Sequence, residues 1–87
     1  MIGVTDVVRR IKPFWDNMPL LCQDTPDTNE LFIVKECNMS GCNIIDLKTG
    51  SSSAWWGYDK LEKVRDGSFE ELRNVIDKAY VRIIWKR

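Results

Sequence analysis

The thiols are the residues of this chain with the most specific chemistry, and there are three of them: Cys22, Cys37 and Cys42. A structural zinc site needs four ligands, usually thiolates and imidazoles, and the chain contains no histidine. A site built from all three thiolates and one aspartate is conceivable, but the spacing of Cys37 and Cys42 is not that of a zinc knuckle. We therefore predict no bound metal and no other cofactor, and thiols that act as small apolar side chains. Opposed across a hairpin, Cys37 and Cys42 could form a disulfide if their geometry permits.

Catalytic chemistry has few candidate residues. Without histidine, the commonest general base is missing. A nucleophilic cysteine would need a lysine or a carboxylate to activate it, and no local motif supplies one. The eight aspartates and five glutamates form no recognisable paired-carboxylate signature. The sequence predicts a protein that is not an enzyme.

The adjacent pair Trp55–Trp56 is the most informative feature for binding. In a strand, neighbouring side chains point to opposite faces of the sheet, so one indole enters the core and the other needs a second cover. That cover is a helix, a loop or a partner. We expect Trp56 to face inward with Ala54 and Tyr58, which leaves Trp55 as the contact residue, although the reverse parity is nearly as good.

A basic ridge is predicted near the C-terminus. Lys78, Arg82 and Lys86 recur every four residues, so on a helix they share one side, with Trp85 next to them. Cations at a helix C-terminus are favoured without any ligand, because they oppose the helix dipole. Such a ridge could also bind an acidic protein surface or a nucleic acid. The predicted partner-binding residues are Trp55, Trp56, Tyr58, Arg82, Trp85 and Lys86, and Arg9 and Arg10 would extend the ridge if two helices lie side by side.

Length and composition describe a single domain over residues 1–87. Thirteen basic and thirteen acidic residues cancel, which argues against broad binding to a nucleic-acid backbone. The N-terminus lacks the apolar run of a signal peptide, and no stretch approaches the roughly 20 apolar residues that cross a bilayer. With an odd number of cysteines, these features predict a cytoplasmic protein with reduced thiols and no membrane partner.

The elements that would position these residues begin with a helix over about 4–16. Its apolar residues recur at helical spacing after an N-cap at Thr5, and Pro13 predicts a kink or an earlier end. A short edge strand at 19–23 and an exposed loop at 24–30 follow.

The middle of the chain predicts an antiparallel meander. Residues 31–37 form the clearest strand, 38–41 a connection and 42–48 its partner, with a third strand over 54–58. The sequence Phe32-Ile33-Val34 places apolar side chains on both faces, so we expect the sheet to be covered on both, by two helices or by a helix and a second chain.

The end of the chain predicts a short helical turn within 59–67 and then a longer helix. Ser68 and Glu71 form a capping box, and apolar residues follow at helical spacing to Ile84. In the alternative, the helix ends near Ala79 and residues 80–85 form a strand, because that run is rich in β-branched and aromatic residues.

The predicted fold is therefore α+β: an N-terminal helix, an antiparallel meander of three to four strands, and a C-terminal helix packed on the sheet. The predicted function is a small non-enzymatic protein-binding module. We expect an inhibitor or regulator of the type encoded by phages and mobile elements, which occupies a surface of a host protein, or a chain that associates with itself. The alternative is a small nucleic-acid-binding or transcription-associated protein that uses the basic C-terminal ridge.

Overall fold

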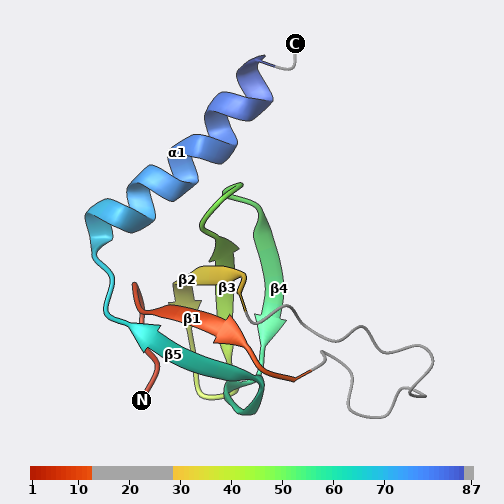
Figure 1. Ribbon diagram of the computed structural model, residues 1–87, viewed down its shortest axis with the longest axis vertical. Helices are drawn as coiled ribbons and strands as arrows, with labels where there is room; N and C mark the ends of the chain where they lie inside the picture. Colours follow the sequence, from red (N-terminus) through yellow and green to blue (C-terminus); the bar gives the residue numbers. More distant parts are fainter. Residues whose placement is uncertain (13–28, 86–87) are drawn as a thin grey trace, which may run out of the picture.

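The computed structural model describes residues 1–12 and 29–85, with the backbone alone for residue 54 and residues 80–85. The predicted break at Pro13, the strand at 19–23 and most of the loop at 24–30 lie outside the described residues. The elements, in chain order, are strands β1 (Val7–Arg10), β2 (Leu31–Cys37), β3 (Cys42–Asp46) and β4 (Ser52–Trp56), the 3₁₀-helix η2 (Tyr58–Lys60), strand β5 (Leu61–Arg65) and helix α1 (Phe69–Trp85) (Figure 1).

The described strands form one antiparallel sheet with the order β4-β3-β2-β1-β5. The predicted pairing of β2, β3 and β4 is confirmed, and β2 has the predicted bounds, but the prediction of three to four strands is wrong, because the described sheet has five. Strand β3 ends at Asp46 rather than at residue 48, because the Asp46 carboxylate accepts hydrogen bonds from the backbone of Lys48 and Thr49 and closes a turn. Strand β4 covers Ser52–Trp56 rather than 54–58, since Tyr58 already begins η2.

The prediction of an N-terminal helix is wrong: Val7–Arg10 is strand β1, and no helix is seen within residues 1–12. β1 lies between β2 and β5, so both of its edges are hydrogen-bonded, and Val7 and Val8, which project to opposite faces of the sheet, are both fully buried. A short apolar run buried on both faces has no strict alternation, and over so few residues it also fits helical spacing. Thr5 is not an N-cap but has a φ of 72°, and its amide donates to the Val34 carbonyl of β2.

The prediction of a helical turn within 59–67 is also wrong in its main part. Leu61–Arg65 is strand β5, which pairs with β1 and completes the described sheet. Only the 3₁₀-helix η2 precedes it, from Tyr58 to Lys60. Leu61 is buried and Val64 is exposed, as expected for a strand, in which residues three apart project to opposite faces. On a helix the two side chains would share one side.

The inner face of the sheet is covered by the sheet itself. β4 and β5 lie at opposite edges, yet Trp56 of β4 and Leu61 of β5 belong to the same buried cluster, so the sheet curls around it. In Figure 1 the β1–β5 pair lies across β3 and β4. The buried members of this inner cluster are Val8, Phe32, Val34, Cys42, Ile44, Trp56 and Leu61.

The outer face of the sheet is covered by α1. Leu72 and Val75 of the helix are buried against Ile33 and Ile45 of the sheet. The predicted burial of both faces is confirmed, but the second cover is the curvature of the sheet and not a second helix. Each large apolar side chain buried in this way stabilises the fold by about 1.5–3 kcal/mol.

The turn between β3 and β4 also touches the helix. Gly50 has a φ of 74°, and a Cβ atom there would lie 2.5 Å from the Val75 carbonyl oxygen and 2.9 Å from the Ala79 nitrogen. Glycine is therefore required at this position for two reasons: the backbone has a positive φ, and the helix backbone leaves no room for a Cβ atom.

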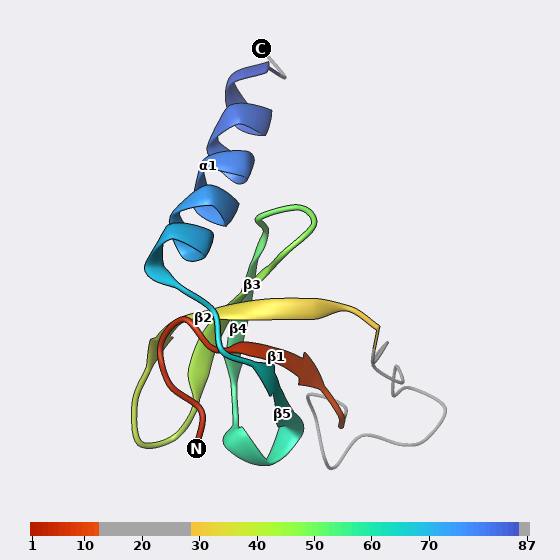
Figure 2. The same ribbon diagram turned by 60° about the vertical axis from the view of Figure 1, so that its left-hand side comes forward.

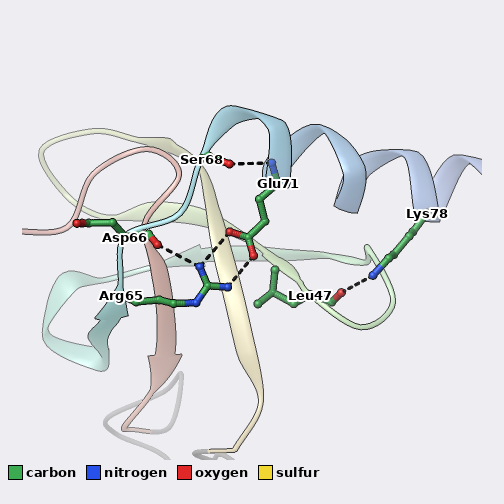
Figure 3. Close-up of polar contacts among 6 residues, drawn as sticks. All are labelled: Leu47, Arg65, Asp66, Ser68, Glu71 and Lys78. Carbon is green, nitrogen blue, oxygen red and sulfur yellow. Dashed lines mark hydrogen bonds and ion pairs between the residues drawn. The ribbon is translucent and has the colours of Figure 1, made fainter.

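Polar contacts hold the first turn of α1 to β5 (Figure 3). The Glu71 amide donates to Ser68 Oγ at 3.1 Å, which confirms the predicted helix cap. The reciprocal half of the capping box is replaced by an ion pair, in which Arg65 donates to both carboxylate oxygens of Glu71 at 2.6 and 3.1 Å. The Arg65 guanidinium lowers the pKa of Glu71.

The long-helix interpretation of the C-terminus is confirmed, because residues 80–85 continue α1. The 17 residues of α1 span about 26 Å, and in both views the C-terminal end of the helix extends beyond the sheet (Figure 2). Within residues 1–12 and 29–85, no helix is long and apolar enough to cross a membrane.

Candidate functional site

The two adjacent tryptophans of β4 lie on opposite faces of the sheet. Trp56 is 6% exposed and belongs to the inner cluster, whereas Trp55 is 44% exposed. The predicted parity, with Trp56 inward, is confirmed. Trp55 is the largest side chain of β4 that the core leaves in contact with solvent, so it is the centre of the candidate site.

Trp55 belongs to a row of side chains that crosses three strands on the outer face. It pairs with Asn43 of β3, and Asn43 pairs with Glu36 of β2. Directly opposed residues of antiparallel strands project from the same face, and Asn43 is two residues from Ile45, which faces α1. We call Glu36, Asn43 and Trp55 the outer row.

The helix leaves the outer row uncovered. α1 contacts the turn before β4 at Gly50, and Trp55 lies five residues further along the chain, about 15 Å away in extended backbone. Glu36 is exposed and Asn43 is half-buried. Ser52 Oγ lies 3.2 Å from Asn43 Oδ1 and holds that amide in place. The outer row therefore presents an indole, an amide and a carboxylate side by side at the β4 edge of the described sheet.

Trp56 has a structural role on the inner face. Its indole Nε1–H donates to Ser53 Oγ at 3.0 Å. The Arg10 guanidinium lies over two inner-face rings, 4.8 Å from the centroid of Phe32 and 5.4 Å from that of Trp56, and it forms an ion pair with Glu30. A cation over aromatic rings contributes about 0.5–2 kcal/mol. These contacts identify Trp56 as a core residue and remove it from the predicted contact surface.

Tyr58 lies on the inner side as well. It is half-buried against the inner cluster, and its hydroxyl donates to the Asn38 carbonyl oxygen at 2.5 Å. Burial and the neighbouring Cys37 raise the pKa of Tyr58. Of the three aromatic residues predicted to bind a partner from β4 and its end, the structure leaves only Trp55 on the outer face.

Two of the residues predicted for the basic ridge and its surroundings, Arg82 and Trp85, belong to α1 and not to the outer row, and Lys86 lies outside the described residues. Lys78, the first member of the ridge, donates to the Leu47 carbonyl oxygen at 3.4 Å and so ties the helix to the β3–β4 turn (Figure 3).

Arg9 and Arg10 do not extend the ridge as predicted. Both belong to strand β1 instead of a helix, and each is ion-paired, Arg9 with Glu62 and Arg10 with Glu30. These pairs neutralise the two arginines locally.

Sequence reasoning missed a second exposed apolar feature on α1. Phe69 is 75% exposed and Ile76 is 40% exposed, and their spacing of seven places them along the same edge of the apolar stripe, next to the buried Leu72. The width of the apolar stripe in the sequence of α1 could have revealed this feature, because the sheet covers only part of a stripe that wide. Glu36 and Asn43 carried no signal of their own, because strand pairing alone brings them next to Trp55.

The described thiols occur as one pair. Cys37 and Cys42 are opposite each other in the β2–β3 hairpin, and both are free. Cys37 is exposed and Cys42 is fully buried, and burial and the neighbouring Cys37 raise the pKa of Cys42 to about 11. Among the described residues, no group of three or more histidine, cysteine, aspartate or glutamate side chains could hold a metal ion. Cys22 lies outside these residues.

Comparisons of the chain with protein-family models, with curated proteins and with solved structures found no match.

Proposed function

We propose that this protein is a non-enzymatic protein-binding module, and that the outer row of Glu36, Asn43 and Trp55 contacts its partner. The observation that carries the proposal is the exposed indole of Trp55 beside the buried indole of Trp56. Trp is enriched at the centres of protein interfaces, where the ring fills a pocket and its N–H finds an acceptor.

The chemistry of the row describes the partner surface. The indole requires an apolar pocket, and the Asn43 amide offers a donor and an acceptor at its edge. The Glu36 carboxylate favours a basic or N–H-rich rim. Occupying the surface of a host protein in this way is how such a module would inhibit or regulate it.

The test compares two surface variants that match in kind. Trp55→Thr removes the indole from β4, and Val64→Thr changes a side chain that is 43% exposed on β5, the other described edge of the sheet. Threonine keeps the strand preference in both cases. Urea unfolding establishes that both variants fold. In a separate step, immobilised wild-type protein is used to purify a stoichiometric partner from the organism that encodes the chain.

Calorimetry with the purified partner then measures the affinity of each variant. We expect Trp55→Thr to weaken binding by about 2 kcal/mol or more, which is roughly 30-fold, and Val64→Thr to leave it within a factor of about two. Equal affinity of folded Trp55→Thr and wild type would refute the proposal.

Salt dependence provides an independent check on the class of partner. A ligand held through six or more phosphates loses about a thousandfold in affinity between about 50 and 200 mM salt. A contact centred on an indole should change far less, because its free energy comes from apolar burial. A steep salt dependence that Trp55→Thr leaves unchanged would contradict the proposal and favour a nucleic acid.

A further inference from the structure

The hydrogen-bond pattern of the β2–β3 hairpin defines the geometry of its two cysteines. The Asn38 amide donates to the Gly41 carbonyl oxygen at 2.9 Å, so residues 38 and 41 are a hydrogen-bonded pair. Such pairs alternate along an antiparallel ladder, which makes the next pair, Cys37 and Cys42, a non-hydrogen-bonded one. In pairs of this kind the two side chains lie closest together and on the same face.

This geometry matches what a disulfide requires. A non-hydrogen-bonded pair has Cα atoms about 4.5 Å apart, within the range of about 4.4–6.8 Å that a disulfide spans. The two Cβ atoms must approach to about 3.5–4.5 Å, and only the closer type of cross-strand pair tends to reach this separation. The Cys37 and Cys42 thiols can therefore join without a change in strand register.

The loop that connects the two cysteines is held in place. The side-chain oxygen of Asn38 accepts hydrogen bonds from the Ser40 amide at 2.9 Å and the Gly41 amide at 3.1 Å. A Cβ atom at Gly41 would lie 2.3 Å from the Trp56 carbonyl oxygen, so the end of the hairpin is pressed against β4. The folded chain therefore pre-orients the two thiols, whereas the unfolded chain must close the loop by chance.

We propose that Cys37 and Cys42 form a reversible dithiol–disulfide site, oxidised by small-molecule disulfides of the glutathione class. The site does not depend on the proposed function. Its two members differ in access: a soluble disulfide reaches the exposed Cys37 but not the fully buried Cys42. Cys37 is therefore the attacking thiol and Cys42 the resolving thiol.

The reaction proceeds in two exchanges. The Cys37 thiolate attacks one sulfur of glutathione disulfide, the disulfide bond of the oxidant breaks, and one glutathione leaves and takes up the proton released by Cys37. The Cys42 thiolate then attacks Sγ of Cys37, and the second glutathione leaves with the proton from Cys42. Two protein thiols are oxidised to one disulfide while one glutathione disulfide is reduced to two glutathiones.

The burial of Cys42 affects the second exchange. Because its pKa is raised to about 11, few Cys42 side chains are thiolates at neutral pH, and resolution of the mixed disulfide is slow. We expect a glutathionyl adduct on Cys37 that forms first, decays into the internal disulfide, and decays faster as the pH is raised.

The experiment uses the full chain with Cys22→Ser, so that Cys37 and Cys42 are its only thiols. The folded protein is equilibrated with mixtures of reduced and oxidised glutathione, quenched with acid and analysed by intact-mass and peptide mass spectrometry. The expected product is lighter by two hydrogen atoms and contains a peptide that links Cys37 to Cys42. Cys37→Ser in the same background should form neither the adduct nor the disulfide.

A parallel titration in denaturing urea tests the geometry. The folded state should favour the internal disulfide over two reduced thiols by at least about tenfold more than the unfolded chain does, because the fold pre-orients the pair. An equal or lower ratio in the folded state would overturn the proposal. So would a reaction that stops at the Cys37 adduct at every pH, or one that yields only disulfide-linked dimers. Cys37 is exposed, so its serine variant folds and keeps the comparison valid.

Discussion

Replacing each tryptophan of β4 by alanine should have very different effects on stability. Trp56 lies in the inner cluster, and truncating a buried tryptophan costs about 3–5 kcal/mol, including the cavity left behind. The loss of the contact with the Arg10 guanidinium adds about 0.5–2 kcal/mol. An 87-residue domain has a total stability of about 4–13 kcal/mol, so Trp56→Ala removes a large part of it or all of it.

Trp55→Ala should cost much less. The indole is 44% exposed, so solvent fills the space that the ring vacates and no closed cavity forms. We expect a cost of about 1 kcal/mol, in the range of ordinary single substitutions.

Urea unfolding followed by circular dichroism measures both effects. With a slope of about 1 kcal/mol/M for a chain of this size, the midpoint should fall by about 3.5–7 M for Trp56→Ala and by about 1 M for Trp55→Ala. If Trp56→Ala does not fold, Trp56→Phe retains most of the ring but loses the hydrogen bond to Ser53, and should cost about 1–2 kcal/mol. Equal costs for the two alanine variants, or a larger cost at Trp55, would refute the assignment of the two faces.

Three further predictions concern the helix and the thiols. Gly50→Ala should destabilise the protein by more than about 2 kcal/mol in urea unfolding, from its positive φ and the clash with α1, whereas Gly3→Ala, where a Cβ atom has room, should cost far less. Glu71→Gln should lower the free energy of unfolding by about 0.2–1 kcal/mol at pH 7. Because the pKa of Glu71 is lowered in the folded state, the difference in stability between wild type and variant should disappear as the pH falls below 4.5, the ordinary pKa of a glutamate, and through the folded-state pKa. The reduced protein should lose stability as the pH rises from 9.0 towards about 11, because the pKa of Cys42 is raised in the folded state, and pH-dependent unfolding of Cys42→Ala should lack this contribution.

Local patterns in the sequence were sufficient for the meander and for α1. Residues 31–37 are rich in β-branched and apolar side chains and are bounded by turn formers, so strand preference and neighbouring turns agree. Ser68 begins a run with helical spacing over four turns, which outweighs the strand preference of residues 80–85. The opposite orientation of Trp55 and Trp56 also follows from the sequence, since the side-chain period of a strand is two.

The tertiary structure decided what local patterns leave open. Val7 and Val8 form a strand because β2 and β5 pair with both edges of β1 and both faces of the sheet are buried there, and no local pattern encodes that position in the sheet. The outer row forms for the same reason: strand pairing brings Glu36 and Asn43 next to Trp55, although they are far apart in the chain. Side-chain period and capping are properties of a few consecutive residues, whereas register and curvature depend on contacts between distant ones, so the folded chain alone determines which exposed residues share a surface.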